Sequence, residues 1–245
     1  MTSLTATTTF TGWKSSWRAQ RPDPHRGWLP VSAVTPQILL KAYAAGVFPM
    51  AESADDPALY WVEPEERGII PLNGLIISRS LRKAVRQRRF DIRIDTAFDE
   101  VMRLCAERTL DRKETWINQR IFRLYGDLHR MGHCHSVESW QDGRLVGGLY
   151  GLRIGAAFFG ESMFSRATDA SKVALVHLVA RLNVGGFTLL DAQFMNPHLE
   201  TLGATPISKV AYLEKLRPAT AAAADFQHFD SDQDPEAVLR MASGG

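Results

Sequence analysis

The residues best suited to chemistry follow an apolar segment in the second half of the chain. The segment Phe158-Phe159-Gly160-Glu161-Ser162-Met163-Phe164-Ser165 runs from aromatic rings into a carboxylate, hydroxyls and a flexible thioether. This order predicts a pocket that takes an apolar side chain whose backbone end is polar, with Phe158, Glu161, Ser162 and Met163 as candidate wall residues. The alternative is a strand end packed in the core, with Glu161 at the surface.

A second polar pair follows the next apolar segment. Asp191 and Gln193 come directly after Phe187–Leu190, which reads as a buried strand. Ligands gather outside the carboxyl ends of strands in open sheets. A carboxylate there can accept a proton or orient an amine, and a neighbouring amide can donate and accept hydrogen bonds at once. The alternative is an Asp that caps the following turn.

The elements between these residues predict that they meet. The pattern indicates a strand over 156–160, a helix over 170–182 and a strand over 187–190. If the two strands are neighbours, Glu161 and Asp191 lie side by side at one end of the sheet. Two carboxylates beside an apolar pocket would give counter-charge to a cationic α-amino group, and a base to deprotonate it.

Other features favour a nucleic-acid partner. Trp116 stands at the start of a helix predicted over 117–131, and Tyr125 lies on it, so both are candidate platforms for a flat base, with core packing as the alternative. Between residues 76 and 90 the chain has six basic residues and no acid, on a helix predicted over 78–88. These side chains form a candidate phosphate-binding surface. The six residues are Arg79, Arg82, Lys83, Arg86, Arg88 and Arg89.

The remaining pattern predicts an α+β fold. A helix is expected from Thr35, its cap, with Pro36 in the first position. Strands are expected over 90–94, 135–141 and 144–152, the last two joined by a turn at Asp142-Gly143. Antiparallel hairpins followed by strand, helix and strand indicate a mixed sheet with packed helices.

Composition and cysteine usage narrow the class of protein. The chain has 245 residues, 45% of them apolar and 23% charged, and a net charge of +2, as expected of a soluble globular protein. With only two cysteines, we expect a reducing cytoplasm. Its two cysteines suit neither a disulfide framework nor a zinc site, and we expect no metal or cofactor. We expect a flexible arm over 1–30, a small domain over 31–74, a larger domain over 75–218 and a mobile acidic tail over 219–245.

Ordered motifs along residues 30–216 resemble one family. They include Lys41 to Met50, Ile77 to Lys83, Thr115-Trp116-Ile117, Leu145 to Gly151, Phe159 to Arg166 and Asp191-Ala192-Gln193. Together they resemble the bacterial leucyl/phenylalanyl-tRNA–protein transferases. Met50 stands where many members have Trp, and Ala192 replaces a usual Cys.

The resemblance implies a larger domain with an acetyltransferase-like (GNAT-like) fold. It implies an aminoacyl-tRNA donor carrying Leu or Phe, and acceptor proteins with N-terminal Arg or Lys. Separately, the chain has no run of 18 apolar residues, so we expect no membrane partner, and we expect a monomer. Asp191 and Gln193 would be the catalytic pair. The residues matching Met50, Trp116, Phe158, Glu161 and Met163 would hold the aminoacyl-adenosine end, and the basic helix would contact the tRNA.

Two other functions are alternatives to this one. An acyl-CoA N-acyltransferase of the same fold needs a glycine-rich amide nest before a helix, but residues 161–170 contain no glycine. A non-catalytic RNA-binding module would explain the basic helix and would leave Glu161 and Asp191 without a role.

Overall fold

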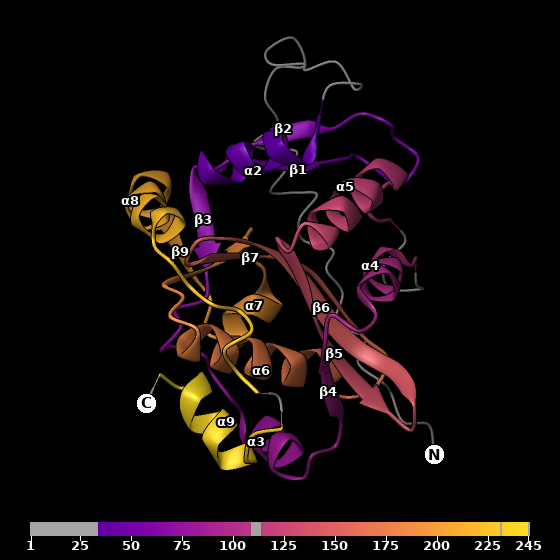
Figure 1. Cartoon of the computed structure of the whole chain (residues 1–245), viewed down its shortest axis with the longest axis vertical. Coiled ribbons are helices and arrows are strands. Elements are labelled where there is room, and N and C mark those ends of the chain that lie inside the picture. Colours follow the sequence, from indigo (N-terminus) through magenta and orange to yellow (C-terminus); the bar gives the residue numbers. More distant parts are fainter. Residues whose placement is uncertain (1–33, 109–113, 231, 245) are drawn as a thin grey trace.

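The computed structural model describes residues 34–108, 114–230 and 232–244, so the arm expected over 1–30 lies outside the described residues. A seven-stranded mixed sheet in the order β4-β5-β6-β7-β8-β3-β9 forms the centre. Helices α6, α3 and α9 cover one face, and α2, α4, α5 and α8 lie on the other (Figure 1). The mixed α/β architecture agrees with the expected fold class.

The first described elements form a small unit on top of the sheet. Helix α2 (Pro36–Ala44) begins at Thr35, whose hydroxyl accepts a hydrogen bond from the Ile38 amide, so the predicted cap is confirmed. Strands β1 (Phe48–Met50) and β2 (Tyr60–Val62) pair with each other. Strand β3 (Glu66–Ile69) instead joins the main sheet between β8 and β9. The small unit therefore ends before Glu66, earlier than the boundary expected at residue 74.

The central hairpins agree with the predicted alternation. Strands β5 (Cys134–Gln141) and β6 (Arg144–Ile154) pair across Asp142-Gly143, which has positive φ angles of 51° and 72°. Strand β4 (Asp91–Ile94) flanks β5. Helix α3 (Arg79–Arg86) precedes β4, and helices α4 (Phe98–Ala106) and α5 (Gln119–Arg130) lie between β4 and β5 in the chain.

The expected strand, helix and strand are β7 (Ala157–Ser165), α6 (Ala170–Val184) and β8 (Leu189–Gln193). Strands β7 and β8 run parallel, but their register covers only residues 157–159 and 189–191. Strand β7 then bulges against β6, because Tyr150 pairs with Ser162 and Gly151 with Gly160. Glu161 is thus the extra residue of the bulge. The sequence predicted a strand that ends at residue 160, but β7 continues to Ser165. Bulges commonly redirect a side chain beside an active site.

The C-terminal segment is packed, which differs from the mobile tail expected after Pro218. Helix α8 (Lys209–Ala221) contains Pro218, and Phe226 and Phe229 beyond it are buried. Helix α9 (Pro235–Ala242) packs against α6 and α3, and the short elements α7 (Pro197–Thr201) and β9 (Thr205–Ser208) precede α8. The acidic composition of this segment suggested a solvated tail, although its aromatic and aliphatic side chains pack against the rest of the protein. No helix in the described ranges has the length and apolar character to cross a membrane.

Candidate active site

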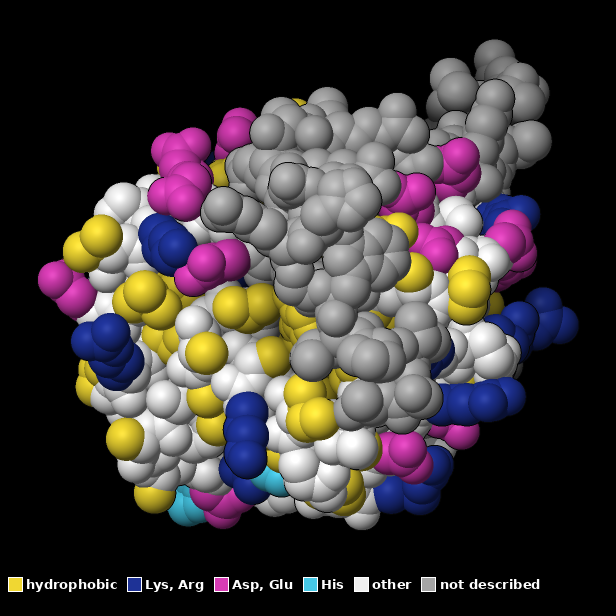
Figure 2. All heavy atoms as spheres, turned by 90° about the horizontal axis from the view of Figure 1, so that it is seen from above, with side chains coloured by type: hydrophobic (Ala, Val, Ile, Leu, Met, Phe, Trp, Pro, Cys, Tyr) yellow, Lys and Arg dark blue, Asp and Glu magenta, His cyan; other side chains and the backbone are white. Residues whose placement is uncertain are grey.

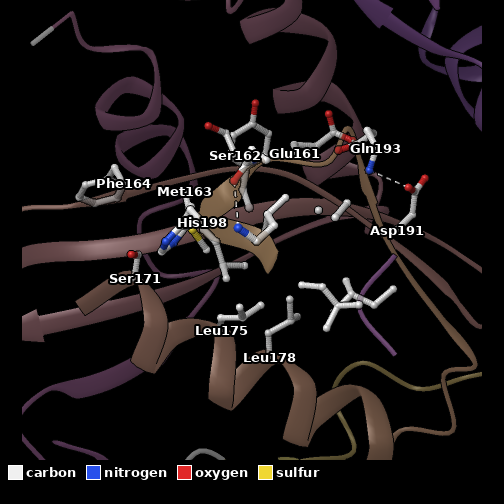
Figure 3. A pocket seen from close by; sticks show the side chains of 18 of the residues that line it. Glu161, Ser162, Met163, Phe164, Ser171, Leu175, Leu178, Asp191, Gln193 and His198 are labelled. Atoms are coloured by element: carbon white, nitrogen blue, oxygen red, sulfur yellow. Dashed lines mark hydrogen bonds between the residues drawn. The ribbon is translucent and has the colours of Figure 1, made fainter. Parts of the chain in front are cut away.

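An apolar pocket lies where β7 and β8 separate (Figure 3). Its floor comes from Leu175 and Leu178 of α6, and its walls from the two strands and the segment that follows β8. The apolar wall residues are Ile70, Leu149, Met163, Phe164, Leu190, Ala192 and Leu199, and the polar ones include Ser162, Ser165, Ser171, Asn196 and His198. We call this the side-chain pocket.

A smaller hollow lies on the other side of the same strand ends. It is lined by Phe48, Pro49, Met50, Trp116, Glu161, Ala192, Gln193 and Phe194. We call it the aromatic hollow. Three residues, Glu161, Ala192 and Gln193, line both the hollow and the side-chain pocket. A ligand with an apolar end and a flat end could occupy both, with its middle at Glu161 and Gln193.

The Glu161 carboxylate is held by buried donors. The Tyr43 hydroxyl donates to its Oε1 at 2.7 Å, and the Tyr125 hydroxyl to its Oε2 at 3.1 Å. The Gln193 side-chain amide donates to Oε1 at 3.3 Å, and the two tyrosine hydroxyls also contact each other. Burial raises the pKa of Glu161 to about 8, although the two tyrosine hydrogen bonds act in the opposite direction. This carboxyl can therefore exchange a proton near neutral pH.

The raised pKa predicts a pH-dependent stability. The folded chain binds a proton at Glu161 that the unfolded chain releases, because the pKa is about 8 folded and near its ordinary value unfolded. The resulting stability is present below the unfolded pKa and lost as the pH rises through 8. We expect the free energy of unfolding to fall with a slope that approaches about 1.4 kcal/mol per pH unit between pH 5 and 8. Urea titrations should show a shallower decline for Glu161→Gln. Parallel profiles for the two proteins would contradict the assignment.

Asp191 is fully buried and lines the side-chain pocket, but both of its carboxylate oxygens already accept hydrogen bonds. The Arg67 guanidinium donates to both of its oxygens, at 2.7 to 3.1 Å. The Tyr212 hydroxyl donates to Oδ2 at 2.8 Å, and the Gln193 backbone amide to Oδ1 at 2.8 Å. Gln193 has a positive φ of 57°, a conformation that costs free energy for a residue other than glycine. The carboxylate of Asp191 thus fixes the backbone that presents the Gln193 side chain to Glu161.

Arg67 is a functional candidate that sequence reasoning missed. It is 1% exposed, and its guanidinium lies 4.5 Å from the ring centroids of both Phe48 and Tyr212. It also donates to the Gly46 carbonyl, so it ties the small N-terminal unit to the end of β8. Burial by itself would lower the pKa of Arg67, but the Asp191 carboxylate outweighs this and raises the pKa above its ordinary value, which keeps the guanidinium charged. Its signal in the sequence was weak, because it stands among Glu63, Glu65 and Glu66 and looks like a surface residue.

The structure brings together most of the side chains predicted to bind a ligand. Ser162 and Met163 lie in the side-chain pocket, and Met50 and Trp116 in the aromatic hollow. Glu161 and Asp191 lie at the same end of the sheet, joined through Gln193 (Figure 3).

Two of the predicted residues lie elsewhere. Phe158 belongs to the part of β7 that still pairs with β8, and its ring stacks on Phe226 with centroids 5.6 Å apart, so it is a core residue and lines neither space. Phe164, farther along the strand, occupies the wall instead. The Tyr125 ring is fully buried, so it cannot serve as a stacking platform; it acts through its hydroxyl on Glu161.

The basic helix α3 lies away from this opening. It packs against α6 and α9 in the layer farthest from the small N-terminal unit (Figure 1). Arg86 forms an ion pair with Glu236, and Arg88 donates to the Gln233 carbonyl. Arg79, Lys83 and Arg89 are exposed and Arg82 is partly exposed, so the helix still presents a basic surface.

Comparisons with known proteins identify the family. Residues 32–65 match the leucyl/phenylalanyl-tRNA protein transferase N-terminal domain, and residues 69–217 match the leucyl/phenylalanyl-tRNA protein transferase family. The change between the two matches falls next to β3, where the small unit ends.

Three relatives carry the name leucyl/phenylalanyl-tRNA–protein transferase. The one from Paramagnetospirillum magneticum (strain ATCC 700264 / AMB-1) is 62% identical over 193 residues, 79% of this chain and 92% of the relative. Those from Rhodopseudomonas palustris (strain BisB18) and Afipia carboxidovorans (strain ATCC 49405 / DSM 1227 / KCTC 32145 / OM5) are 56% and 55% identical over 202 residues, 82% of this chain and 88% and 89% of theirs.

Among solved structures, L-PGS from Bacillus licheniformis matches with a TM-score of 0.35 and 13% identity, over 66% of this chain and about half (51%) of that one, too distant a likeness to support an argument. The family matches and the identities to these relatives agree with the motifs read from the sequence. The chain therefore belongs to the leucyl/phenylalanyl-tRNA–protein transferase family and is an aminoacyltransferase.

Proposed function

We propose that this enzyme moves Leu or Phe, and Met less well, from aminoacyl-tRNA to the N-terminal Arg or Lys of acceptor proteins. The product would carry a new peptide bond and a destabilising N-terminal residue that marks it for N-end-rule degradation in the cytoplasm. One observation supports the donor most directly: Glu161 and Gln193 form a wall shared by an apolar pocket and an aromatic hollow. An aminoacyl-adenosine has an apolar end, a flat end and a reactive ester between them.

The proposed placement follows from the chemistry of each space. The Leu or Phe side chain occupies the side-chain pocket above Leu175 and Leu178. The terminal adenine lies against the Trp116 ring and the Met50 side chain. Met50 offers a polarisable thioether where many members of the family have a second aromatic ring. The ester carbonyl then stands beside Glu161. The split between β7 and β8, with the N-terminus of α6 opening toward it, supports a GNAT-like arrangement of the larger unit.

In the proposed reaction the α-amino group of the acceptor attacks the ester carbonyl. A new nitrogen–carbon bond forms, the carbonyl carbon–oxygen bond breaks, and the 3′ hydroxyl of the tRNA leaves. Glu161 accepts the proton from the amine and returns it to the leaving oxygen. Its pKa of about 8 lies close to the value of about 7.7–8.0 for an α-amino group. Proton transfer between groups of similar pKa is efficient near neutral pH.

Asp191 and Gln193, predicted as the catalytic pair, take different parts in this proposal. Gln193 contacts the Glu161 carboxylate and lines both ligand spaces, so it orients the ester and the base. Asp191 is enclosed by Arg67, Tyr212 and the Gln193 amide, so it positions Gln193 and does not take the proton itself.

The side-chain pocket predicts how donors are selected. Leu and Phe have an unbranched Cβ and pass a narrow entrance, whereas Val and Ile are branched there. We expect Leu178→Phe to shorten the pocket and to reduce Phe transfer more than Leu transfer, by about 10- to 100-fold in the ratio of kcat/KM. Competing leucyl- and phenylalanyl-tRNA in one assay measures that ratio. An unchanged ratio would place the donor side chain outside the pocket.

The proposed tRNA contacts extend beyond the terminal nucleotide. The exposed side chains of α3 offer a phosphate-binding surface that reads little sequence. We propose that the enzyme acts as a monomer.

Transfer of labelled leucine from leucyl-tRNA to a peptide that begins with Arg tests the proposed function. The same peptide with an acetylated N-terminus is the control, because it has no free amine. Labelling of the free peptide alone supports the proposal. Absence of labelling with both peptides, using folded enzyme, would refute it.

A further inference from the structure

A polar pocket at the N-terminus of α5 adjoins the aromatic hollow. It is lined by Ala54, Asp55, Asp56, Pro57, Asn118, Gln119, Arg120 and Arg123. Two chain segments connect it to the hollow, since Met50 precedes Ala54 by four residues and Trp116 precedes Asn118 by two. The Asn118 side-chain amide donates to the Asp56 carbonyl at 2.7 Å and joins these segments. The two spaces are therefore linked by two short stretches of chain.

Two cations in this pocket lack anionic partners within the described parts of the chain. Arg120 and Arg123 stand one turn apart on α5, and neither takes part in an ion pair with another described residue. Nη1 of Arg120 is shielded from solvent and has no hydrogen-bond partner among the residues that the structure describes. A shielded guanidinium nitrogen without an acceptor is costly, and an anion bound there would satisfy it.

The carboxylates of the same pocket are already engaged. Asp55 forms an ion pair with Arg108 at 2.8 Å. The Asp56 side chain accepts from the Ala58 amide at 2.9 Å and from the Glu52 amide at 3.4 Å. Neither acid is paired with Arg120 or Arg123. The N-terminus of a 12-residue helix adds a partial positive charge at the same place.

The upper face of the molecule, which carries the small N-terminal unit, has hydrophobic side chains near its centre and charged ones of both signs around them (Figure 2). An RNA strand on such a mixed surface needs local cationic contacts, because the net charge of the chain is only +2. Arginine suits this task, since its planar guanidinium can bind two phosphate oxygens at once.

We propose that Arg120 and Arg123 bind the phosphodiester groups of the nucleotides next to the terminal adenosine of the donor RNA. This site rests on the proposed function, because it assumes that the adenosine occupies the aromatic hollow. It is distinct from α3, which would contact a more distant part of the tRNA. The single-stranded 3′ end would thus be held at two points, by its base in the hollow and by its backbone on α5.

Three donors of increasing length test this site: leucyl-adenosine, a leucyl trinucleotide with the last two phosphodiesters, and leucyl-tRNA. We expect Arg120→Ala/Arg123→Ala to leave the KM for leucyl-adenosine unchanged. The KM for the trinucleotide and for the tRNA should rise about tenfold or more. The dependence of log KM on log salt should become shallower by about 1 to 1.5 units for two lost single-strand contacts.

Matched variants separate this effect from a general loss of charge. Arg130→Ala removes the same charge from the other end of α5 and should change none of the three KM values. Arg120→Lys/Arg123→Lys keeps the charge but not the planar fork, and should show a smaller rise. An equal rise for leucyl-adenosine and the trinucleotide, or no rise for the trinucleotide, would overturn the proposal. Failure of wild-type enzyme with all three donors would instead refute the proposed function.

Discussion

Arg67→Ala is expected to lower the free energy of unfolding by about 3–5 kcal/mol and to reduce transfer to background. The substitution leaves the fully buried Asp191 carboxylate without its cation, and removes the bond that joins the Gly46 carbonyl to the end of β8. The backbone of Gln193 then loses a fixed partner for its unfavourable φ angle. Urea unfolding and labelled-leucine transfer on the same preparations measure both effects.

The double variant Arg67→Met/Asp191→Leu separates stability from positioning. Replacing both members of a buried ion pair by apolar residues is often neutral or stabilising, so much of the lost stability should return. Transfer should not return, because the carboxylate that holds Gln193 is absent. Recovery of both stability and transfer would show that the pair is structural only.

Glu161→Gln is expected to lower the rate of the transfer step by about 10²- to 10⁴-fold, with little change in the KM for leucyl-tRNA. Glutamine has nearly the same shape, and its amide oxygen can still accept the hydrogen bond from Tyr43, but the amide cannot accept a proton from the amine. Single-turnover transfer at saturating donor isolates this step. The affinity of the variant for leucyl-adenosine, measured without transfer, is the control that shows whether the pocket is intact. A rate within a few-fold of wild type would remove Glu161 as the base.

The strand–helix–strand topology and the meeting of the two acidic residues could be predicted from sequence, because both depend on local rules. An apolar run, a helix and a second apolar run predict parallel neighbouring strands, and the ends of such strands share one edge. The pairing of Phe159 with Asp191 agrees with this. The periodicity could not show that β7 bulges at Glu161, since a bulge depends on the partner strand.

The predictions from sequence that were wrong, or that missed a residue, all depend on contacts between distant parts of the chain. Phe158 and Phe164 have the same side-chain type, and only the point at which β7 and β8 separate decides which one lines the pocket. Arg67 stands in an acidic surface-like segment, and its partner is 124 residues away. The C-terminal residues have a composition typical of a solvated tail, yet Phe226 and Phe229 bury it against α6. No local pattern encodes these pairings.

The placement of the donor across the shared wall is tested most directly by a crystal structure with the amide analogue of leucyl-adenosine, which cannot transfer its amino acid. The leucine side chain should lie above Leu175 and Leu178, the adenine against Trp116, and the amide carbonyl within hydrogen-bond reach of Gln193. A leucine side chain in the aromatic hollow, or an analogue bound away from Glu161, would contradict the account.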